Sequence, residues 1–459
     1  MNAESDRRMR IVSLNGLLGY GYPLDSLERA LAMEPDLVGV DAGSTDPGPY
    51  YLGAGESFVS DAQVRSDLEP ALRVAVTRGL PLVIGTAGGA GGRPHLDGLA
   101  EMVREIAADY GLRFRMATIP AEVAEGDVLA ALGEGRIEPC GPAHGLTEDN
   151  VRSCTRIVGQ MGTDPLIEAL EGGADVVLAG RCCDAAIFAA GAIMRGYDPG
   201  PALHMGKILE CGTLAARPAG ANDVLVGTID ERGFEVVPAN PERRCLPASV
   251  AAHSLYEQPD PNCFYEPEGR VDLSESEYAR VDSQTVRVMG SRLIPAEQQT
   301  VKLEGARLAG FRTIAVAGVR DPLIIERLDE IEHSVLAAVA DAMADALAPG
   351  EFGVRFLRYG IDGVTDGREA APKPLPREVG LVIDAIAPTQ ELADRVLKLA
   401  RSTALHQHFD GRKTTAGNFA FPFSPSDFSG GPVYEFAVYH LMRVDDSREF
   451  FPVSFEEAG

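Results

Sequence analysis

The segment that decides the fold is residues 174–218, ADVVLAGRCCDAAIFAAGAIMRGYDPGPALHMGKILECGTLAARP. It begins with a short apolar, β-branched run at residues 176–178, which predicts a buried strand. A polar turn follows, from Arg181 to Asp184, and then a long apolar helix. In a parallel α/β sheet, ligands bind beyond the carboxyl ends of the strands. We therefore expect Arg181 and Asp184 to lie at such a site, together with Glu210, which ends the next helical stretch.

Upstream of this segment, apolar runs of strand length alternate with helical patterns of about ten to fifteen residues. This alternation predicts an α/β class with a doubly wound, mainly parallel sheet. We expect residues 1–219 to form this Rossmann-like domain, with glycine-rich loops between strands and helices. The expected strands are residues 10–14, 37–40, 80–84 and 114–119, and the expected helices are residues 24–33, 67–78, 96–110 and 121–132.

The character of the sequence changes after Pro218. Residues 223–229 and 234–237 are strand-like and are joined by a short turn that contains glycine, which predicts a hairpin. Further strand-like runs and two long helical patterns follow. We expect residues 220–459 to form a second, α+β domain, with the functional site at the junction of the two domains.

Composition restricts the function. The chain has 459 residues and a formal net charge of -26, and such a field repels phosphate backbones and argues against nucleic acid as a partner. Seven scattered cysteines without a CxxC motif indicate reduced thiols, and no apolar signal segment follows the N-terminus, so we expect a cytoplasmic protein. The longest apolar stretch, residues 185–194, is far shorter than a membrane span, and no membrane association is expected.

Two glycine-rich loops follow predicted strands, at residues 15–21 and 85–93. Neither matches a dinucleotide-binding or Walker A motif. The glycines of the first loop either form a tight turn or contribute to binding. For the second loop we favour binding, because consecutive backbone N–H groups at a helix start attract anions and Arg93 adds a positive charge. Gly88, Gly89 and Arg93 are therefore candidate substrate-binding residues.

Asp41, Asp184 and Glu210 are the carboxylates that the predicted fold brings together. A carboxyl group shielded by apolar walls has a raised pKa and can exchange protons near neutral pH. Asp184 also fits the N-cap of a helix, and Glu210 also fits a buried salt bridge with Arg181 or Lys207. Both explanations remain open beside the catalytic one.

Other polar residues are candidates of a second kind. Ser44 and Thr45 follow the second predicted strand and either bind a substrate oxygen or form a turn. His406 and His408 flank one glutamine. On a strand they would share a face and could bind a metal, but on a helix they diverge, so we expect His408 either to face substrate or to form structural hydrogen bonds. Asn418 and Ser424 lie in a proline-rich segment that either closes over a pocket or connects the domains. The cysteines fit small core residues better than nucleophiles.

Four segments carry a resemblance to a known family: residues 165–184 (PLIEALEGGADVVLAGRCCD), 207–212 (KILECG), 301–305 (VKLEG) and 416–427 (AGNFAFPFSPSD). Over nearly its whole length the chain resembles the acyclic terpene utilisation (AtuA-like) proteins. That resemblance implies a role in the catabolism of branched carboxylic acids and their CoA esters. Some members carry an additional ferredoxin-like domain. We expect this chain to lack it after residue 442, and we therefore expect a separate small subunit and a hetero-oligomer.

We therefore expect a lyase of the hydratase or dehydratase type that acts on a small branched or hydroxy carboxylic acid or its CoA ester. Asp41, Asp184, Glu210 and His408 would transfer protons, and Arg93 or Arg181 would hold the substrate carboxylate. The alternatives are an acyl or CoA-ester hydrolase and a non-catalytic subunit that binds a metabolite. No motif requires a cofactor, and the sequence leaves dependence on a divalent metal open.

Overall fold

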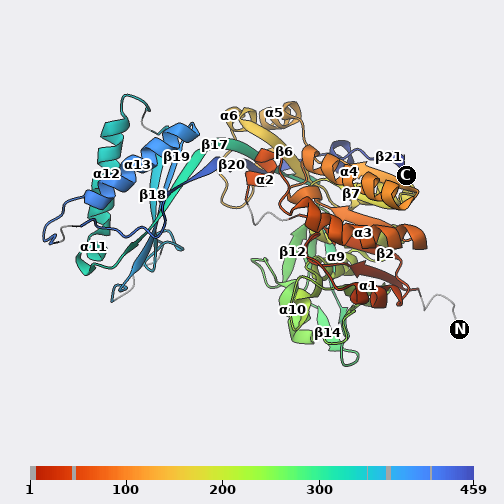
Figure 1. Ribbon diagram of the computed structural model, residues 1–459. Coiled ribbons are helices and arrows are strands. Elements are labelled where there is room, and N and C mark those ends of the chain that lie inside the picture. The colour runs from red at the N-terminus through yellow and green to blue at the C-terminus, as the bar shows by residue number, and fades with distance from the viewer. Residues whose placement is uncertain (1–6, 44–47, 349, 369–373, 414–415) are drawn as a thin grey trace. The chain divides into compact units, whose positions relative to one another are not determined.

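The computed structural model describes residues 7–43, 48–348, 350–368, 374–413 and 416–459 (Figure 1). The chain divides into two compact units. Unit 1 contains Met1–Arg307 and Phe436–Gly459, and unit 2 contains Leu308–Glu435. In the described part of the chain, no helix has the length and apolar character needed to cross a membrane.

Unit 1 is built on a ten-stranded mixed sheet. Its centre is parallel, because β1, β2, β3, β7 and β4 all run in the same direction. Antiparallel strands extend both edges. In spatial order the strands are β14 (Glu277–Arg280), β15 (Val286–Met289), β10 (Gly233–Pro238), β9 (Leu225–Asp230), β1 (Met9–Ser13), β2 (Leu37–Asp41), β3 (Leu82–Gly85), β7 (Val176–Ala179), β4 (Phe114–Ile119) and β21 (Ser454–Ala458).

Helices cover both faces of this sheet, as the buried sequences of its central strands require. All residues of β2, β3 and β7 are buried, which is typical of parallel strands with helices on both sides. One core contains α1 (Leu24–Leu31), α3 (Asp61–Arg78) and α4 (Arg93–Tyr110), and the other contains α7 (Thr163–Glu171), α8 (Asp184–Met194) and α9 (Pro199–Leu209). The doubly wound arrangement is therefore present around the parallel strands.

Helices α8 and α9 are apolar on nearly every side and lie inside unit 1. They approach each other closely because α9 carries Gly206 at the contact. A Cβ atom on Gly206 would lie 2.3 Å from the carbonyl oxygen of Ala185, so only glycine fits there. This close approach brings the start of α8 near the end of α9, and with it Asp184 near Glu210.

Smaller elements complete unit 1. The short strands β8 (Ala216–Arg217) and β11 (Arg244–Cys245) form a two-stranded ladder, and β12 (Cys263–Glu266), β13 (Gly269–Asp272) and β16 (Arg292–Pro295) form a three-stranded sheet. The remaining elements are α2 (Tyr50–Ala54), α5 (Glu125–Gly133), β5 (Ile137–Pro139), α6 (Glu148–Arg152), β6 (Cys154–Gln160), α10 (Pro247–Ser254) and the 3-10 turns η1 (Ala87–Gly89), η2 (Gly212–Ala215) and η3 (Ser447–Phe450).

Unit 2 is an antiparallel sheet with its own core. The long strands β17 (Thr300–Val319) and β20 (Asp427–Arg443) connect the two units along the chain, and β18 (Gly353–Tyr359) and β19 (Val379–Ala387) extend the sheet. The core of unit 2 lies between one face of these strands and the helices α12 (Leu328–Met343) and α13 (Gln390–His406). The short helix α11 (Pro322–Glu326) precedes α12.

The structure confirms a mixed α/β class with parallel strands, but the large sheet is mixed rather than mainly parallel. The predicted hairpin is β9–β10, and it does not begin a separate domain, because β9 pairs with β1 and extends the main sheet. Whereas the sequence favours a division at residues 219 and 220, the compact units divide at Arg307 and Glu435. Local composition does not show that a later strand pairs with an earlier one. The sequence therefore gives a different domain boundary from the structure.

Candidate active site

Asp41, Asp184 and Glu210 line one cavity of about 260 Å³ in unit 1. Each comes from the end of a different element: Asp41 ends β2, Asp184 begins α8, and Glu210 follows α9. Arg181, in the turn between β7 and α8, also lines the cavity. The structure thus brings together the carboxylates that the sequence grouped, and every residue that lines this cavity belongs to unit 1.

Asp41 is almost fully buried at the end of β2. It is 3% exposed, and its Oδ1 accepts a hydrogen bond of 3.2 Å from the backbone N–H of Gly43. Burial and the nearby charge of Asp184 raise the pKa of Asp41 well above its usual range, against the opposing effect of Arg181. Asp41 therefore holds its proton more tightly than a solvated aspartate does.

Asp184 is the first residue of α8, and the N-cap of that helix is Cys183, which makes no capping hydrogen bond through its side chain. The N-cap explanation for Asp184 is therefore wrong. Burial raises the pKa of Asp184, and the charges of Arg181 and Lys207 oppose that rise. Its Oδ1 is buried and has no hydrogen-bond partner among the described residues. An unpaired buried oxygen is costly, and at a cavity wall a bound ligand would relieve this cost.

Glu210 is paired with Lys207. The Nζ of Lys207 donates a hydrogen bond of 2.6 Å to Oε1 of Glu210, and both side chains are buried. The salt bridge that the sequence allowed is therefore present. Burial nevertheless raises the pKa of Glu210 to about 8, although Lys207 counteracts it, and the charge of Asp184 adds to the rise.

Arg181 is fixed by a second buried carboxylate, Glu304 on β17. The Nε of Arg181 donates to Glu304 at 3.0 Å, and the two side chains are 6% and 4% exposed. Lys302 also binds Glu304, at 2.9 Å. Burial alone would raise the pKa of Glu304, but Arg181 and Lys302 hold it below its usual value. Glu304 thus stays ionised and orients the guanidinium of Arg181.

A further carboxyl group and the thiols lie around this site. Cys183 donates a hydrogen bond to Glu266 on β12, whose pKa burial raises to about 8. Burial also raises the pKa of the Cys182 and Cys183 thiols. Cys211 lines the cavity, and burial raises its pKa as well. Thiols in such surroundings are poor nucleophiles, in agreement with their role as core residues.

The amides of both glycine loops interact with carboxylates of the protein itself. In the first loop, the N–H groups of Gly19 and Gly21 donate to Asp67 at 2.7 and 3.0 Å. At the second, the N–H of Arg93 at the start of α4 donates to Glu122 at 2.8 Å. These backbone N–H groups therefore already have carboxylate partners within unit 1.

Arg93, Gly88 and Gly89 do not line the carboxylate cavity. The side chain of Arg93 is exposed and binds Asp97 at 2.9 Å on its own helix. Gly88 lines a different cavity, beside His95, and the N–H of Gly89 donates to the carbonyl of Thr86. The structure therefore does not bring these three residues together with the carboxylates of the unit 1 cavity.

His408, Asn418 and Ser424 belong to unit 2, so they are not part of the cavity in unit 1. His408 is exposed beyond the end of α13, and Ser424 is exposed as well. Asn418 is buried, and its Nδ2 donates to the carbonyl oxygens of Ala404 and Gln407 at 3.0 and 2.9 Å. Asn418 therefore fixes a loop to a helix end. Ser44 and Thr45 lie outside the described residues.

The sequence suggested a salt bridge for Lys207 but no catalytic role. It suggested no role for Glu304 or Tyr256. Lys207 stands three residues before Glu210 on a helical pattern, a spacing at which opposite charges meet. Glu304 lies in the segment 301–305, which carried the family resemblance without an assigned role. Tyr256 lines the cavity, and the Lys207 ammonium lies 5.8 Å from its ring centre. No pattern in the sequence identifies that tyrosine.

In the described residues, no group of three or more His, Cys, Asp or Glu side chains is arranged to hold a metal ion. Residues 59–423 match the model of the acyclic terpene utilisation family protein AtuA. This match covers most of the chain, and the chain therefore belongs to the AtuA family, which confirms the resemblance seen in its sequence. No curated protein and no solved structure matches the chain.

Proposed function

We propose that this AtuA family member is a hydro-lyase that adds or removes water next to the carboxyl or thioester group of a small branched or hydroxy acid. One observation carries the proposal: the carboxyls of Asp41, Asp184 and Glu210 meet in one cavity, and all three have raised pKa values. Buried carboxyls outnumber the two adjacent cations, Arg181 and Lys207, so some of them retain protons near neutral pH.

Two of the three carboxyls, Asp184 and Glu210, suit different steps of a dehydration. The charges of both Arg181 and Lys207 favour the ionised form of Asp184, so we assign it as the base that removes the α-proton. Glu210, with a pKa of about 8, holds a proton near neutrality and is assigned as the acid. The C–O bond breaks, the hydroxyl leaves as water with the proton from Glu210, and the double bond forms. In this proposal Glu210 takes the acid role predicted for His408.

Arg181 suits the recognition of the substrate carboxylate or thioester oxygen. Glu304 accepts hydrogen bonds from two of its nitrogens, at 3.0 and 3.4 Å, which fixes the plane of the guanidinium. The N–H groups that remain can bind an oxygen that gains negative charge as the α-proton leaves. Because the cavity is screened by apolar helices, this interaction is stronger than it would be in water.

The test is an assay of the full chain, coexpressed with any small protein encoded beside it. A panel of hydroxy di- and tricarboxylates, and then their CoA thioesters, is monitored for ultraviolet absorbance of a conjugated alkene. The proposal expects a signal that is lost in Asp184→Asn and kept in the surface variant Asp97→Asn. Loss of the signal with EDTA would add a metal to the mechanism, and silence with both panels would refute the hydro-lyase proposal.

Cys211 supports a second candidate function, an acyl or CoA-ester hydrolase, because its thiol lines the same cavity. Its raised pKa disfavours the thiolate that such a reaction needs. Thiol modification with loss of thioester hydrolysis, reproduced by Cys211→Ser, would favour this candidate over the first. A normal pathway flux in cells that carry Asp41→Asn and Asp184→Asn would instead favour a non-catalytic, metabolite-binding subunit.

A separate small subunit of ferredoxin-like fold remains part of the proposal. It is tested by copurification with the tagged chain. Full activity of the chain purified alone would argue against this partner and would leave the assignment of the cavity unchanged.

A further inference from the structure

A second cavity in unit 1, of about 500 Å³, is rich in arginine although the chain as a whole is strongly acidic. Arg217, Arg243 and Arg244 line it, against the single carboxylate of Glu242. Asp223 pairs with Arg243, and Glu242 offsets one of the two other guanidinium groups, so an excess of positive charge remains at this position. Such a local excess attracts anions in spite of the net charge of the chain.

Arg217 and Arg244 stand directly opposite each other on the ladder formed by β8 and β11. Like charges in such a pair repel each other and weaken the ladder. Arg217 donates to the carbonyl oxygen of Ala216 at 2.8 Å, and among the described residues no carboxylate forms an ion pair with the Arg244 side chain. Both arginines are exposed. An anion between them would convert the repulsion into two attractive contacts.

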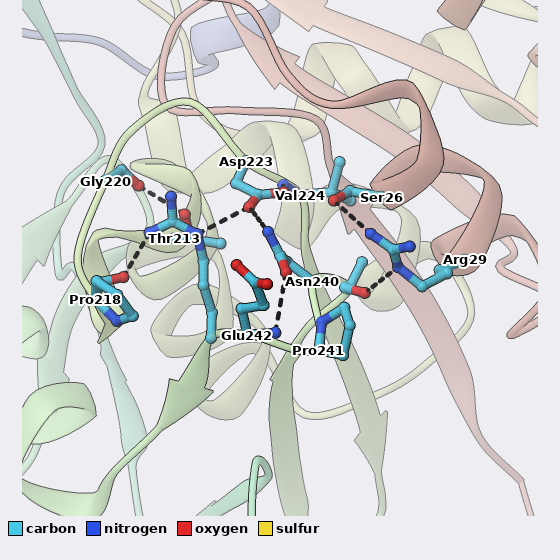
Figure 2. A network of polar contacts seen from close by, with 12 residues as sticks. Ser26, Arg29, Thr213, Pro218, Gly220, Asp223, Val224, Asn240, Pro241 and Glu242 are labelled. Carbon is cyan, nitrogen blue, oxygen red and sulfur yellow. Dashed lines mark hydrogen bonds and ion pairs between the residues drawn. The ribbon is translucent and has the colours of Figure 1, made fainter.

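The third arginine, Arg243, is fixed by a network of hydrogen bonds. Figure 2 shows Asp223 between Asn240 and the loop that carries Pro218. The Nε of Arg243 donates to Asp223 at 2.8 Å, its Nη1 donates to the carbonyl of Pro218, and Nδ2 of Asn240 donates to Asp223 at 2.8 Å. Asp223 is 1% exposed. Arg243 is therefore a fixed wall of the cavity, whereas Arg217 and Arg244 are available to a ligand.

We propose that this cavity binds a phosphate ester larger than inorganic phosphate, such as the phosphorylated part of a nucleotide. Guanidinium groups bind phosphate through paired N–H donors, and a dianionic phosphate can bridge two arginines where a single carboxylate neutralises only one. The cavity is far larger than one phosphate group. Ser283 and Gln284, which also line it, add polar groups for the rest of such a ligand.

One short segment of the chain contributes residues to both this cavity and the carboxylate cavity. Cys211, Leu214 and Ala221 line the carboxylate cavity, and Arg217 and Pro218, from the same short segment, line the arginine cavity. Thr213 fixes the segment through a hydrogen bond of 2.7 Å to the carbonyl of Gly220. Binding of a phosphate ester does not require the proposed hydro-lyase activity, and each can fail without the other.

Isothermal titration calorimetry of the full chain at low salt tests the inference with three probes: inorganic phosphate, pyrophosphate and adenosine 3′,5′-bisphosphate. We expect the nucleotide to bind most tightly. The double variant Arg217→Gln/Arg244→Gln should weaken it by about tenfold for each arginine, because each loses a charge-assisted contact. The matched control Arg113→Gln removes an exposed arginine outside the cavity and should bind within about twofold of wild type.

Thermal unfolding separates lost binding from lost folding. Without a ligand the double variant should be at least as stable as wild type, because the repulsion across the ladder is gone. The nucleotide should raise the Tm of wild type and of Asp184→Asn, but not that of the double variant. Equal affinities in wild type and the double variant, no binding of any probe to wild type, or binding of inorganic phosphate as tight as that of the nucleotide would overturn the inference.

Discussion

The carboxylates that line the cavity of unit 1 are buried beside apolar helices. The polar segment 417–427 of unit 2, in contrast, lies mostly at the surface. Both regions are rich in the residue types that catalysis uses. In unit 1 burial raises the pKa values of Asp41, Asp184 and Glu210, and each carboxyl has charged neighbours. In unit 2 Asn418 bonds backbone carbonyls and His408 faces solvent.

The comparison shows that chemical capability follows from burial and neighbouring charge, and not from residue type alone. A polar residue at the surface keeps its usual properties, because water solvates it. A carboxyl at the end of a buried strand or helix changes its proton affinity, because water is largely excluded. The following variants test whether this distinction holds.

The largest effect is expected for Asp184→Asn, which removes a base and leaves the shape of the cavity almost unchanged. General base catalysis contributes about 10²–10⁴-fold, so kcat/KM should fall by that factor in the absorbance assay. The unit 2 variants His408→Asn and Ser424→Ala should retain activity within about twofold. A comparable loss in either of these variants would contradict the assignment of the site to unit 1.

A large loss of stability is expected for Glu304→Gln, which removes the charge of the carboxylate that is hydrogen-bonded to the buried guanidinium of Arg181. Removing one member of a buried pair costs about 3–5 kcal/mol in the free energy of unfolding. The partly exposed pair of Arg401 and Asp427 in unit 2 is the matched comparison. Asp427→Asn should cost about 1 kcal/mol or less in denaturant unfolding. Equal losses would remove the distinction between the two regions.

Stability should depend on pH through the raised carboxyl pKa values. Glu210 and Glu266 have pKa values of about 8 in the folded chain, above the ordinary 4.5. Between these values the folded chain holds protons that the unfolded chain has released, so their contribution to the free energy of unfolding falls as pH rises and levels off above about 8. The slope is up to about 1.4 kcal/mol per pH unit for each group. Denaturant unfolding from pH 6 to 9 should show a shallower slope for Glu266→Gln and an unchanged slope for the exposed control Glu297→Gln.

A smaller effect is expected for Asn418→Ala in unit 2. Two hydrogen bonds to backbone carbonyls are lost, and about 1–2 kcal/mol of stability should go with them. The turnover of the unit 1 cavity should not change. A loss of turnover with unchanged unfolding would show that Asn418 contacts the substrate after all.

The sequence predicted part of this picture because some of its signals are local. The apolar strand at residues 176–178 and the turn that carries Arg181 and Asp184 were recognisable from pattern alone, and so was the contact of Lys207 with Glu210 through helical spacing. Strand ends in a parallel sheet share one edge, which explains why Asp41 was placed correctly beside Asp184.

Other features depend on distant parts of the chain and leave no local pattern. Glu304 reaches Arg181 only because β17 pairs with β6, and β9 joins the main sheet only because it pairs with β1. The glycine loop at residues 85–93 has the composition of an anion-binding loop, but Glu122 occupies its helix start. Glu210 is buried and His408 is exposed, and this difference likewise depends on the assembled fold.

The central claim is that carboxyls of the unit 1 cavity hold protons near neutral pH. A ¹³C NMR titration of the full chain with labelled glutamate carboxyls measures this directly and needs no substrate. The account predicts resonances that titrate near pH 8, one of which disappears in Glu210→Gln and remains in Glu297→Gln. If the resonance that disappears in Glu210→Gln titrates below about pH 6 in the wild type, where solvated side chains do, the cavity has no special acid–base capacity and the claim is contradicted.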